Sequence, residues 1–478
     1  MEALTWTGSV AFLNPILIVA VGLLAISVAA WVATSLFTAG ARPVTGADGT
    51  ITLAGNPTAI VGLGVRMAFV ATSAVILAYI VLGLAMGTSA GIVGGISQQF
   101  TPVWISLVAL FALSLGFKRK LGLYGKLFDS PIGMIGFGIV MFWVFTAIFA
   151  SLDMIATHDA LSQVSGMKNK VPGTPLRGAS EGDYQWYLLG GDNLARDVFS
   201  RMVKGSTEVL KYAPLATLFA FMVGITLGLP AGYFGGRLDT FLSFLANLIL
   251  AFPVILLFYL LVTPEIVETG LPQYMAVVLF SFPLIFSGVL LHSRFKTQPS
   301  KNLTYLAIVL VPLFLLYMSL INSAGSKIDF WPLDFFEIPG GVLVVFVSVV
   351  FVNSPTVFRI VRGLALDIKT RDYVAAAQTR GESTWYIMLW EILPNVRGPL
   401  IVDFCLRIGY TIILLGTLGF FGLGLPPESP DWGSTINDGR KLLSIYLHPA
   451  LPPAFALMSL VLGLNLLADG LREESLKD

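Results

Sequence analysis

The feature that most constrains this chain is a succession of long apolar runs separated by polar connections. Most are roughly 17 to 25 residues long, the length with which an α-helix crosses a bilayer. They lie near Ala11–Phe37, Val61–Met86, Val103–Phe117, Ile132–Leu152, Tyr212–Pro230, Leu238–Val262, Tyr274–Leu291, Leu303–Ile321, Gly341–Val361, Leu400–Gly419 and His448–Ala468. The pattern predicts an all-α polytopic membrane protein with about eleven transmembrane helices. The shortest run, Val103–Phe117, is short enough to be re-entrant.

Composition supports this class and excludes others. The 478 residues are 56% hydrophobic and 12% charged, about half the charge of a soluble domain. A net charge of +1 leaves no basic surplus for nucleic acid. The single cysteine excludes a disulfide within the chain, and the three histidines lie far apart, so we expect no metal site. The first residues lack the positive segment of a signal peptide, so we expect the first apolar run to be retained.

Lysine and arginine in the short connections predict the orientation. The basic connections are Phe117–Lys126, His292–Lys301 and Arg359–Arg380. If every span is real, all three fall on one side, and positive charge marks the cytoplasmic side. The amino terminus is then external, the carboxyl terminus is cytoplasmic, and the long segment 153–211 is external.

One cytoplasmic stretch, residues 371–395, combines charge, glycine and apolar periodicity. Asp372–Arg380 contains good helix formers, Gly381 allows a sharp turn, and Ser383 is suited to cap a second short helix. We expect Pro394 to end that helix. Its apolar positions recur with helical spacing at Trp385, Met388, Leu389 and Ile392. Such a helix pair either rests on lipid headgroups or docks into the groove of a soluble partner.

Two features within the predicted spans have structural and functional interpretations. Gly224, Gly228 and Gly232 form a small-residue ladder, which indicates close helix packing or, alternatively, a hinge. Asp403 and Arg407 are four residues apart on one helix face. We favour a structural ion pair over a proton relay or a substrate contact, because the two charges can neutralise each other.

Two external features are also ambiguous. Asp192, Arg196, Asp197 and Arg201 form a charged segment. We expect either a solvated helix on the membrane interface, or a segment that positions a binding protein or lines an external gate. The aromatic stretch Phe330–Phe336 is expected to lie at the headgroup level, and docking of an accessory protein is the alternative.

Motifs of catalysis and nucleotide binding are absent from the sequence. It contains no G-x-x-x-x-G-K-[ST] phosphate loop, no H-E-x-x-H and no G-x-S-x-G. We therefore expect no enzyme, and any dependence on ATP must come from another subunit.

Several segments together resemble the permease subunits of bacterial dipeptide and oligopeptide ABC importers. In residues 371–395, Ala376-Ala377 precede Gly381, and thirteen positions separate Gly381 from Pro394, as in the cytoplasmic "EAA" loop of that family. The other matching segments follow in order: "GGDNLARDVFSRMVKGS" (Gly190–Ser206), "PAGYFGGRLD" (Pro230–Asp239), "LAFPVILL" (Leu250–Leu257), "FRIVRG" (Phe358–Gly363), "LGFFGLGLPPESPDWG" (Leu418–Gly433) and "LNLLADGLRE" (Leu464–Glu473). Their shared order carries the resemblance.

The resemblance implies a six-helix type I importer permease core with about five added helices. Residues 131–263 and 339–478 would form the core, whereas residues 1–130 and 264–338 would be additions. Family members pair with a homologous permease, two ATPase subunits that hold ATP and Mg²⁺, and an extracytoplasmic binding protein, within the lipid of the bacterial inner membrane. No cofactor is expected on this chain. The residues implied to dock the ATPase are Asp372, Tyr373, Ala375, Ala376, Ala377, Gly381, Trp385, Met388, Leu389 and Pro394.

Two departures from the family pattern keep other hypotheses open. Ala375 stands where the family has glutamate, and Gly416 stands where many relatives have an acidic residue. Importers of nickel complexes, oligosaccharides or other peptide-like solutes belong to the same family. An ion-coupled secondary transporter would need several unpaired charges at mid-membrane and an internal repeat. A membrane scaffold without transport is the third hypothesis.

Overall fold

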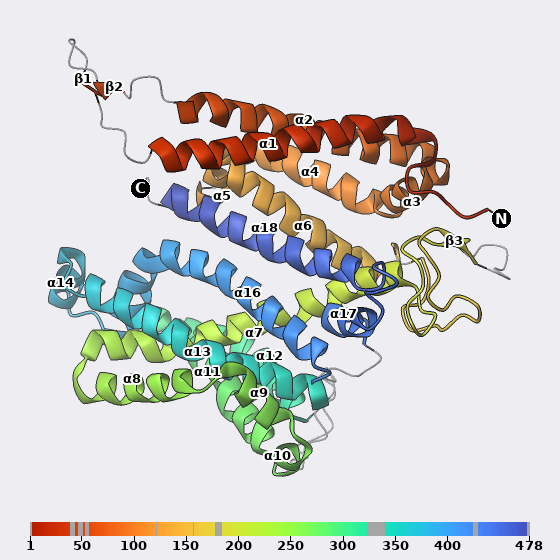
Figure 1. Cartoon of the computed structure of the whole chain (residues 1–478). Coiled ribbons are helices and arrows are strands. Elements are labelled where there is room, and N and C mark those ends of the chain that lie inside the picture. The colour runs from red at the N-terminus through yellow and green to blue at the C-terminus, as the bar shows by residue number, and fades with distance from the viewer. Residues whose placement is uncertain are drawn as a thin grey trace. The chain divides into compact units, whose positions relative to one another are not determined.

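The computed structural model describes residues 2–38, 44–45, 51–52, 57–120, 122–155, 157–176, 184–322, 340–423 and 429–475. The predicted aromatic stretch Phe330–Phe336 lies outside these residues. Within them the fold is helical, with two short antiparallel strand pairs, β1 (Val44–Thr45) with β2 (Ile51–Thr52) and β3 (Thr174–Pro175) with β4 (Trp186–Tyr187). The predicted all-α class is confirmed (Figure 1).

The helices follow one another as expected from the apolar runs. The α-helices are α1 (Asn14–Thr38), α2 (Pro57–Met86), α3 (Gly91–Gln99), α4 (Thr101–Phe117), α5 (Gly122–Lys126), α6 (Pro131–Ser151), α7 (Val198–Phe234), α8 (Gly236–Ala251), α9 (Val254–Val262), α10 (Pro264–Glu268), α11 (Leu271–Phe295), α12 (Pro299–Asn322), α13 (Gly340–Ile368), α14 (Asp372–Thr379), α15 (Thr384–Tyr386), α16 (Arg397–Phe420), α17 (Trp432–Arg440) and α18 (Leu451–Ser475). Short 3₁₀ helices are η1 (Gly8–Leu13), η2 (Gly87–Ala90), η3 (Lys118–Lys120), η4 (Leu127–Asp129) and η6 (Leu393–Val396), and η5 (Ile387–Ile392) is a π-helix.

The number of membrane spans agrees with the sequence. Among the described residues, ten helices are long and apolar enough to cross a membrane, and a bent pair raises the number to eleven if it counts as one span. The bent pair is α8 and α9, whose axes differ by 83°. It occupies the run Leu238–Val262, where a single helix was expected. The break falls at Phe252, which is extended, and Pro253, which lacks the amide hydrogen needed to continue a helix.

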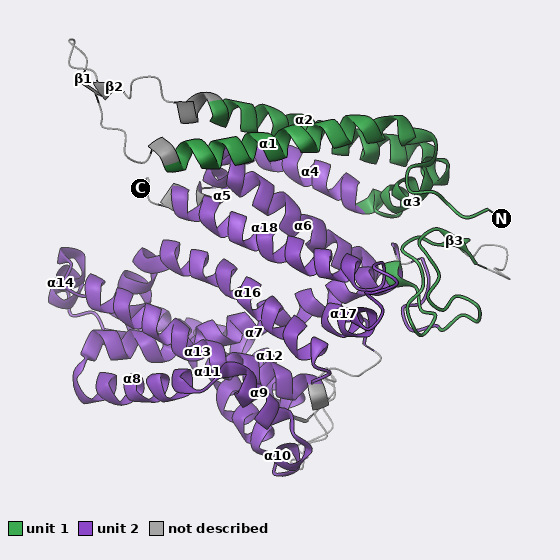
Figure 2. Cartoon of the chain, viewed as in Figure 1, with its two compact units in different colours: residues 1–102, 163–199 green, residues 103–162, 200–478 purple. Residues whose placement is uncertain are grey.

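The chain divides into two compact units (Figure 2), residues 1–102 with 163–199, and residues 103–162 with 200–478. In the first unit, α1 packs against α2, and the segment after residue 163 joins these amino-terminal helices. The Leu4 amide donates a hydrogen bond to the Gly173 carbonyl at 2.9 Å, and the Phe100 and Phe199 rings meet edge to face. Residues 163–199 therefore form one compact unit with the amino-terminal helices.

In the second unit, glycines allow close helix contact. A Cβ atom at Gly136 of α6 would lie 2.7 Å from the Gly463 carbonyl oxygen of α18. The predicted ladder on α7 packs against α13: a Cβ atom at Gly228 would lie 2.9 Å from the Phe358 carbonyl oxygen, and one at Gly232 would lie 2.6 Å from that of Arg362. This supports the packing interpretation of the ladder. Within this unit, α14 lies at one end, and α10 and α17 lie at the other (Figure 1).

Candidate functional site

Residues 371–395, which we name the docking loop, form the predicted helix, glycine turn and helix. After α14, Gly381 has a φ angle of +76°, a left-handed conformation that favours glycine. Ser383 then caps the second helix, because its Oγ accepts a hydrogen bond from the Tyr386 amide at 3.4 Å. Near Pro394, where this helix was expected to end, the π-helix stops at Ile392, and Val396 has φ −101° and ψ 3°, outside helical geometry, before α16 begins at Arg397. Pro394 lies in the first turn of η6, where its missing amide hydrogen is tolerated.

The two faces of the docking loop differ in exposure. The exposed members of the implied docking set are Asp372, Tyr373, Ala375, Ala376, Gly381, Trp385 and Pro394. Ala377 and Met388 are fully buried, and Leu389 is 4% exposed. The apolar stripe therefore packs within the chain, and only Trp385 of that stripe is left at the surface.

The buried face anchors the loop to the transmembrane helices. Val374, Ala377 and Met388 belong to a cluster that includes residues of α7 and α13. Polar contacts add to it: Gln378 Nε2 donates to Tyr233 Oη at 2.9 Å, and Arg380 pairs with Glu391 at 2.9 Å. These contacts fix the loop against the transmembrane helices and leave its other face exposed to solvent.

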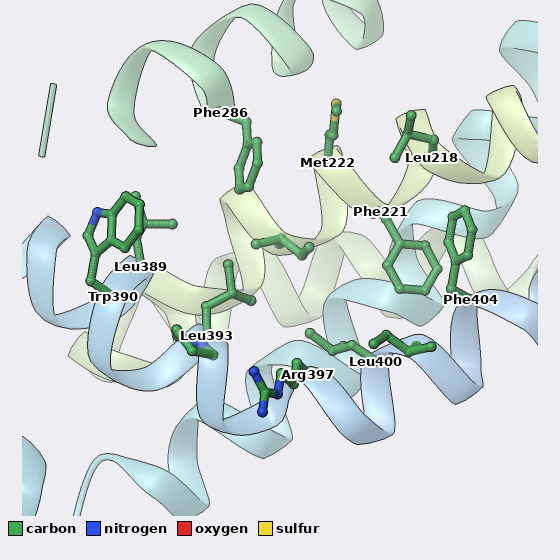
Figure 3. Close-up of a pocket in the computed structure, with 13 residues that line it drawn as sticks. Leu218, Phe221, Met222, Phe286, Leu389, Trp390, Leu393, Arg397, Leu400 and Phe404 are labelled. Atoms are coloured by element: carbon green, nitrogen blue, oxygen red, sulfur yellow. The ribbon is translucent and has the colours of Figure 1, made fainter. Parts of the chain in front are cut away.

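An apolar groove of about 450 Å³ lies beside the docking loop (Figure 3). Its walls come from α7, α11, the π-helix and α16. They include Leu218, Phe221, Met222, Ile225, Phe286, Leu389, Trp390, Leu393, Pro394, Leu400, Ile401 and Phe404. Arg397, at the start of α16, is the charged residue of its lining. Sequence reasoning missed this groove because its walls come from segments far apart in the chain.

Asp403 and Arg407 form an ion pair on α16. Arg407 Nε donates to Asp403 Oδ2 at 2.8 Å. The Arg407 side chain is 10% exposed and the Asp403 side chain is 16% exposed. A second ion pair, missed from the sequence, joins α8 to α13. Arg362 Nη2 donates to Asp239 Oδ2 at 2.6 Å, and Arg362 Nε also reaches the carboxylate. Both pairs neutralise charge within the helices.

The charged segment at Asp192–Arg201 differs from the solvated helix that was one of its two interpretations. Asp192, Arg196, Asp197 and Arg201 are each at most 3% exposed. Asp192 accepts hydrogen bonds from the amides of Leu194 and Arg196 and from Arg196 Nε, at 2.8, 2.9 and 2.6 Å. The helix begins only at Val198, because the Asp192 carboxylate organises a compact turn before it. The ion pair of Asp192 and Arg196 holds the turn together, and none of the four charges faces solvent.

Arg201 lies in the second unit, where it meets the segment before α17. Its Nη2 donates to the Ser429 carbonyl at 3.0 Å and to Thr435 Oγ1 at 3.1 Å. Asp431 caps α17 by accepting from the Ser434 amide at 2.9 Å. Burial raises the pKa of the Asp431 carboxyl above its ordinary value, and the hydrogen bonds from Ser434 oppose this rise. This buried cluster fixes the end of the bundle opposite the docking loop.

The described residues contain no group of three or more His, Cys, Asp or Glu side chains placed to hold a metal ion.

The fold and the docking loop define a multi-pass membrane protein with a surface-exposed helical element at one end of its bundle. The chain belongs to the family described as "Binding-protein-dependent transport system inner membrane component", whose sequence profile matches residues 224–473. This match covers more than half of the 478 residues. The predicted resemblance to importer permeases is therefore confirmed.

Three curated relatives are similar over most of the chain. The glutathione transport system permease protein GsiD of Pectobacterium atrosepticum is 30% identical over 294 residues, 62% of this chain and 73% of that protein. The dipeptide transport system permease protein DppC of Alkalihalophilus pseudofirmus is 27% identical over 350 residues, 73% and 87% of the two chains. The probable D,D-dipeptide transport system permease protein DdpC of Escherichia coli is 27% identical over 345 residues, which cover 72% of this chain and 87% of that protein.

Family membership defines the coarse function. The chain is a non-catalytic, multi-pass inner-membrane permease of a binding-protein-dependent ABC importer, and it works with the other components of that complex.

Proposed function

We propose that this chain forms, together with a homologous permease, the translocation path for short peptides. An extracytoplasmic binding protein delivers the peptide, and two ATPase subunits drive transport through the docking loops. The relatives support the peptide substrate, because their names refer to glutathione, dipeptides and D,D-dipeptides. ATP and Mg²⁺ bind to the ATPase subunits, and this chain holds no cofactor.

The observation that carries this proposal is the separation of buried and exposed faces on the docking loop. A buried face bonded to α7 and α13 makes the loop rigid, and the exposed face is left for a partner. Helix η6 and α16 follow the π-helix directly in the chain, so a displacement of the loop is passed to α16. ATP binding in one subunit thereby changes access to a path in another, which is coupling between distinct sites.

The orientation and the added helices belong to the same proposal. The docking loop and the carboxyl terminus lie in the cytoplasm, and the amino terminus is external, as the basic connections indicate. Residues 1–130 and 264–338 are additions to the six-helix core formed by residues 131–263 and 339–478. They bind lipid or an additional subunit.

Two substitutions at Gly381 test the docking loop. The complex is purified in mild detergent and the ATPase that accompanies it is quantified. Gly381→Pro forces φ to about −65°, which is incompatible with the observed +76°. Gly381→Asn is the matched control, because asparagine tolerates left-handed backbone and a Cβ atom there meets no neighbour within 4 Å.

We expect the wild type and Gly381→Asn to retain the ATPase and Gly381→Pro to lose most of it while staying folded and monodisperse. Equal retention by both variants would contradict the docking role of the loop. Absence of any ATPase from the folded wild type would contradict the importer itself.

A further inference from the structure

The end of α11 contacts the docking loop directly. Trp390 Nε1 donates to Ser293 Oγ at 3.1 Å, and Arg294 Nη1 donates to Tyr386 Oη at 3.3 Å. The guanidinium carbon of Arg294 also lies 4.7 Å from the centre of the Trp390 ring, within the range of a cation–π contact. Two hydrogen bonds and one cation–π contact therefore tie this helix end to the second half of the loop.

Trp390 belongs to the π-helix of the docking loop and contacts α11. Trp390 lies in η5, and π-helices are rare segments that redirect side chains, frequently at functional sites. One side of its environment is the apolar groove, which Phe286 of α11 also lines (Figure 3). On its other side, the Trp390 ring makes the hydrogen bond with Ser293. Helix α11 thus supports the loop on both its apolar and its polar side.

A polar hollow of about 540 Å³ opens between the same two elements. One wall is the end of α11, with Arg294, Lys296 and Thr297. The opposite wall belongs to the docking loop, with Glu382, Ser383 and Tyr386.

The charges in the hollow favour an acidic occupant. Arg294 and Lys296 are both exposed. Glu382 is the carboxylate of the lining, and Arg380 Nε lies 4.0 Å from it, which offsets part of its charge. Two cations therefore face one partly compensated anion, and the hollow has an excess of positive charge.

We propose that the end of α11 is a second half of the ATPase docking surface and that Lys296 receives an acidic side chain of the ATPase subunit. This inference rests on the proposed function of the docking loop. It commits to the ATPase because a subunit seated on Gly381–Tyr386 necessarily covers the hollow that these residues wall. A helix from the region that we propose as an addition would then contribute to coupling.

The test compares two charge reversals that differ in position alone. Lys296→Glu reverses a charge in the hollow, and Lys301→Glu makes the same change on the adjacent α12, where Lys301 is exposed and outside the lining. The purified permease pair is placed in nanodiscs of phosphatidylcholine alone, or with phosphatidylglycerol added. The Kd of its purified ATPase subunits is then measured at two salt concentrations.

We expect Lys296→Glu to raise the Kd about tenfold in both lipids, because an attractive contact becomes repulsive. Lys301→Glu should leave it within twofold of wild type, and high salt should shrink the difference. Equal effects of the two reversals would overturn the inference. An effect confined to phosphatidylglycerol would also overturn it, by identifying a lipid headgroup as the occupant. If the wild type binds the ATPase subunits and Lys296→Glu binds them with the same Kd, this inference alone is overturned. If the wild type does not bind them at all, the proposed function is overturned as well.

Discussion

The ion pair of Asp403 and Arg407 distinguishes two mechanisms at the scale of single residues. Ionisable groups inside a membrane protein are costly and usually functional, so a proton-coupled transporter would use this pair. Their direct contact at 2.8 Å and low exposure instead make them a neutralised unit within α16. In the ATP-driven account, the pair stabilises the helix that continues from the docking loop.

Single and double substitutions at this pair give different expected results. Asp403→Leu leaves the Arg407 charge buried without its partner. Thermal unfolding should show that the free energy of unfolding falls by about 3 kcal/mol. The double variant Asp403→Leu with Arg407→Met removes both charges and should recover most of that loss. It should also retain ATP-dependent uptake. Loss of uptake in a stable double variant would instead assign the pair to proton or substrate transfer.

The glycines of α7 provide a test of helix packing. Gly228→Leu should destabilise the protein by about 1–3 kcal/mol or prevent assembly, because its Cβ meets the α13 backbone 2.9 Å away. Gly363→Leu is the control on α13 itself, where an added Cβ meets nothing within 4 Å. Thermal unfolding of the two variants in detergent measures the difference, and equal losses would contradict close packing at Gly228.

Elements were predicted well where hydrophobic length decides them, and less well where contacts between distant segments decide. The apolar runs locate the spans because crossing a bilayer needs a continuous apolar helix. The sequence did not reveal that a π-helix precedes Pro394 and that a short 3₁₀ helix includes it, since the effect of a proline depends on whether it falls in a first turn. Nor did it reveal that Met388 and Leu389 pack inward, because their periodicity is the same for an internal or an external partner.

At the scale of the whole molecule, sequence reasoning placed the external segment 153–211 within the first half of the permease core. In the structure, residues 163–199 form a compact unit with the amino-terminal helices. The contact of Leu4 with Gly173 joins positions far apart in the chain, and no local pattern encodes such a pairing. A solvated helix was one of the two interpretations of the charged residues of this segment, because burial of a paired charge cannot be read from spacing alone.

The central claim, ATP-driven import of peptides, is tested most directly by uptake into proteoliposomes. The chain is reconstituted with its homologous permease and ATPase subunits, ATP is enclosed, and labelled dipeptide is added outside with the binding protein. We expect uptake that requires both ATP and the binding protein and that persists when ionophores dissipate proton and sodium gradients. Uptake that is driven by an ion gradient in the absence of ATP would contradict this account.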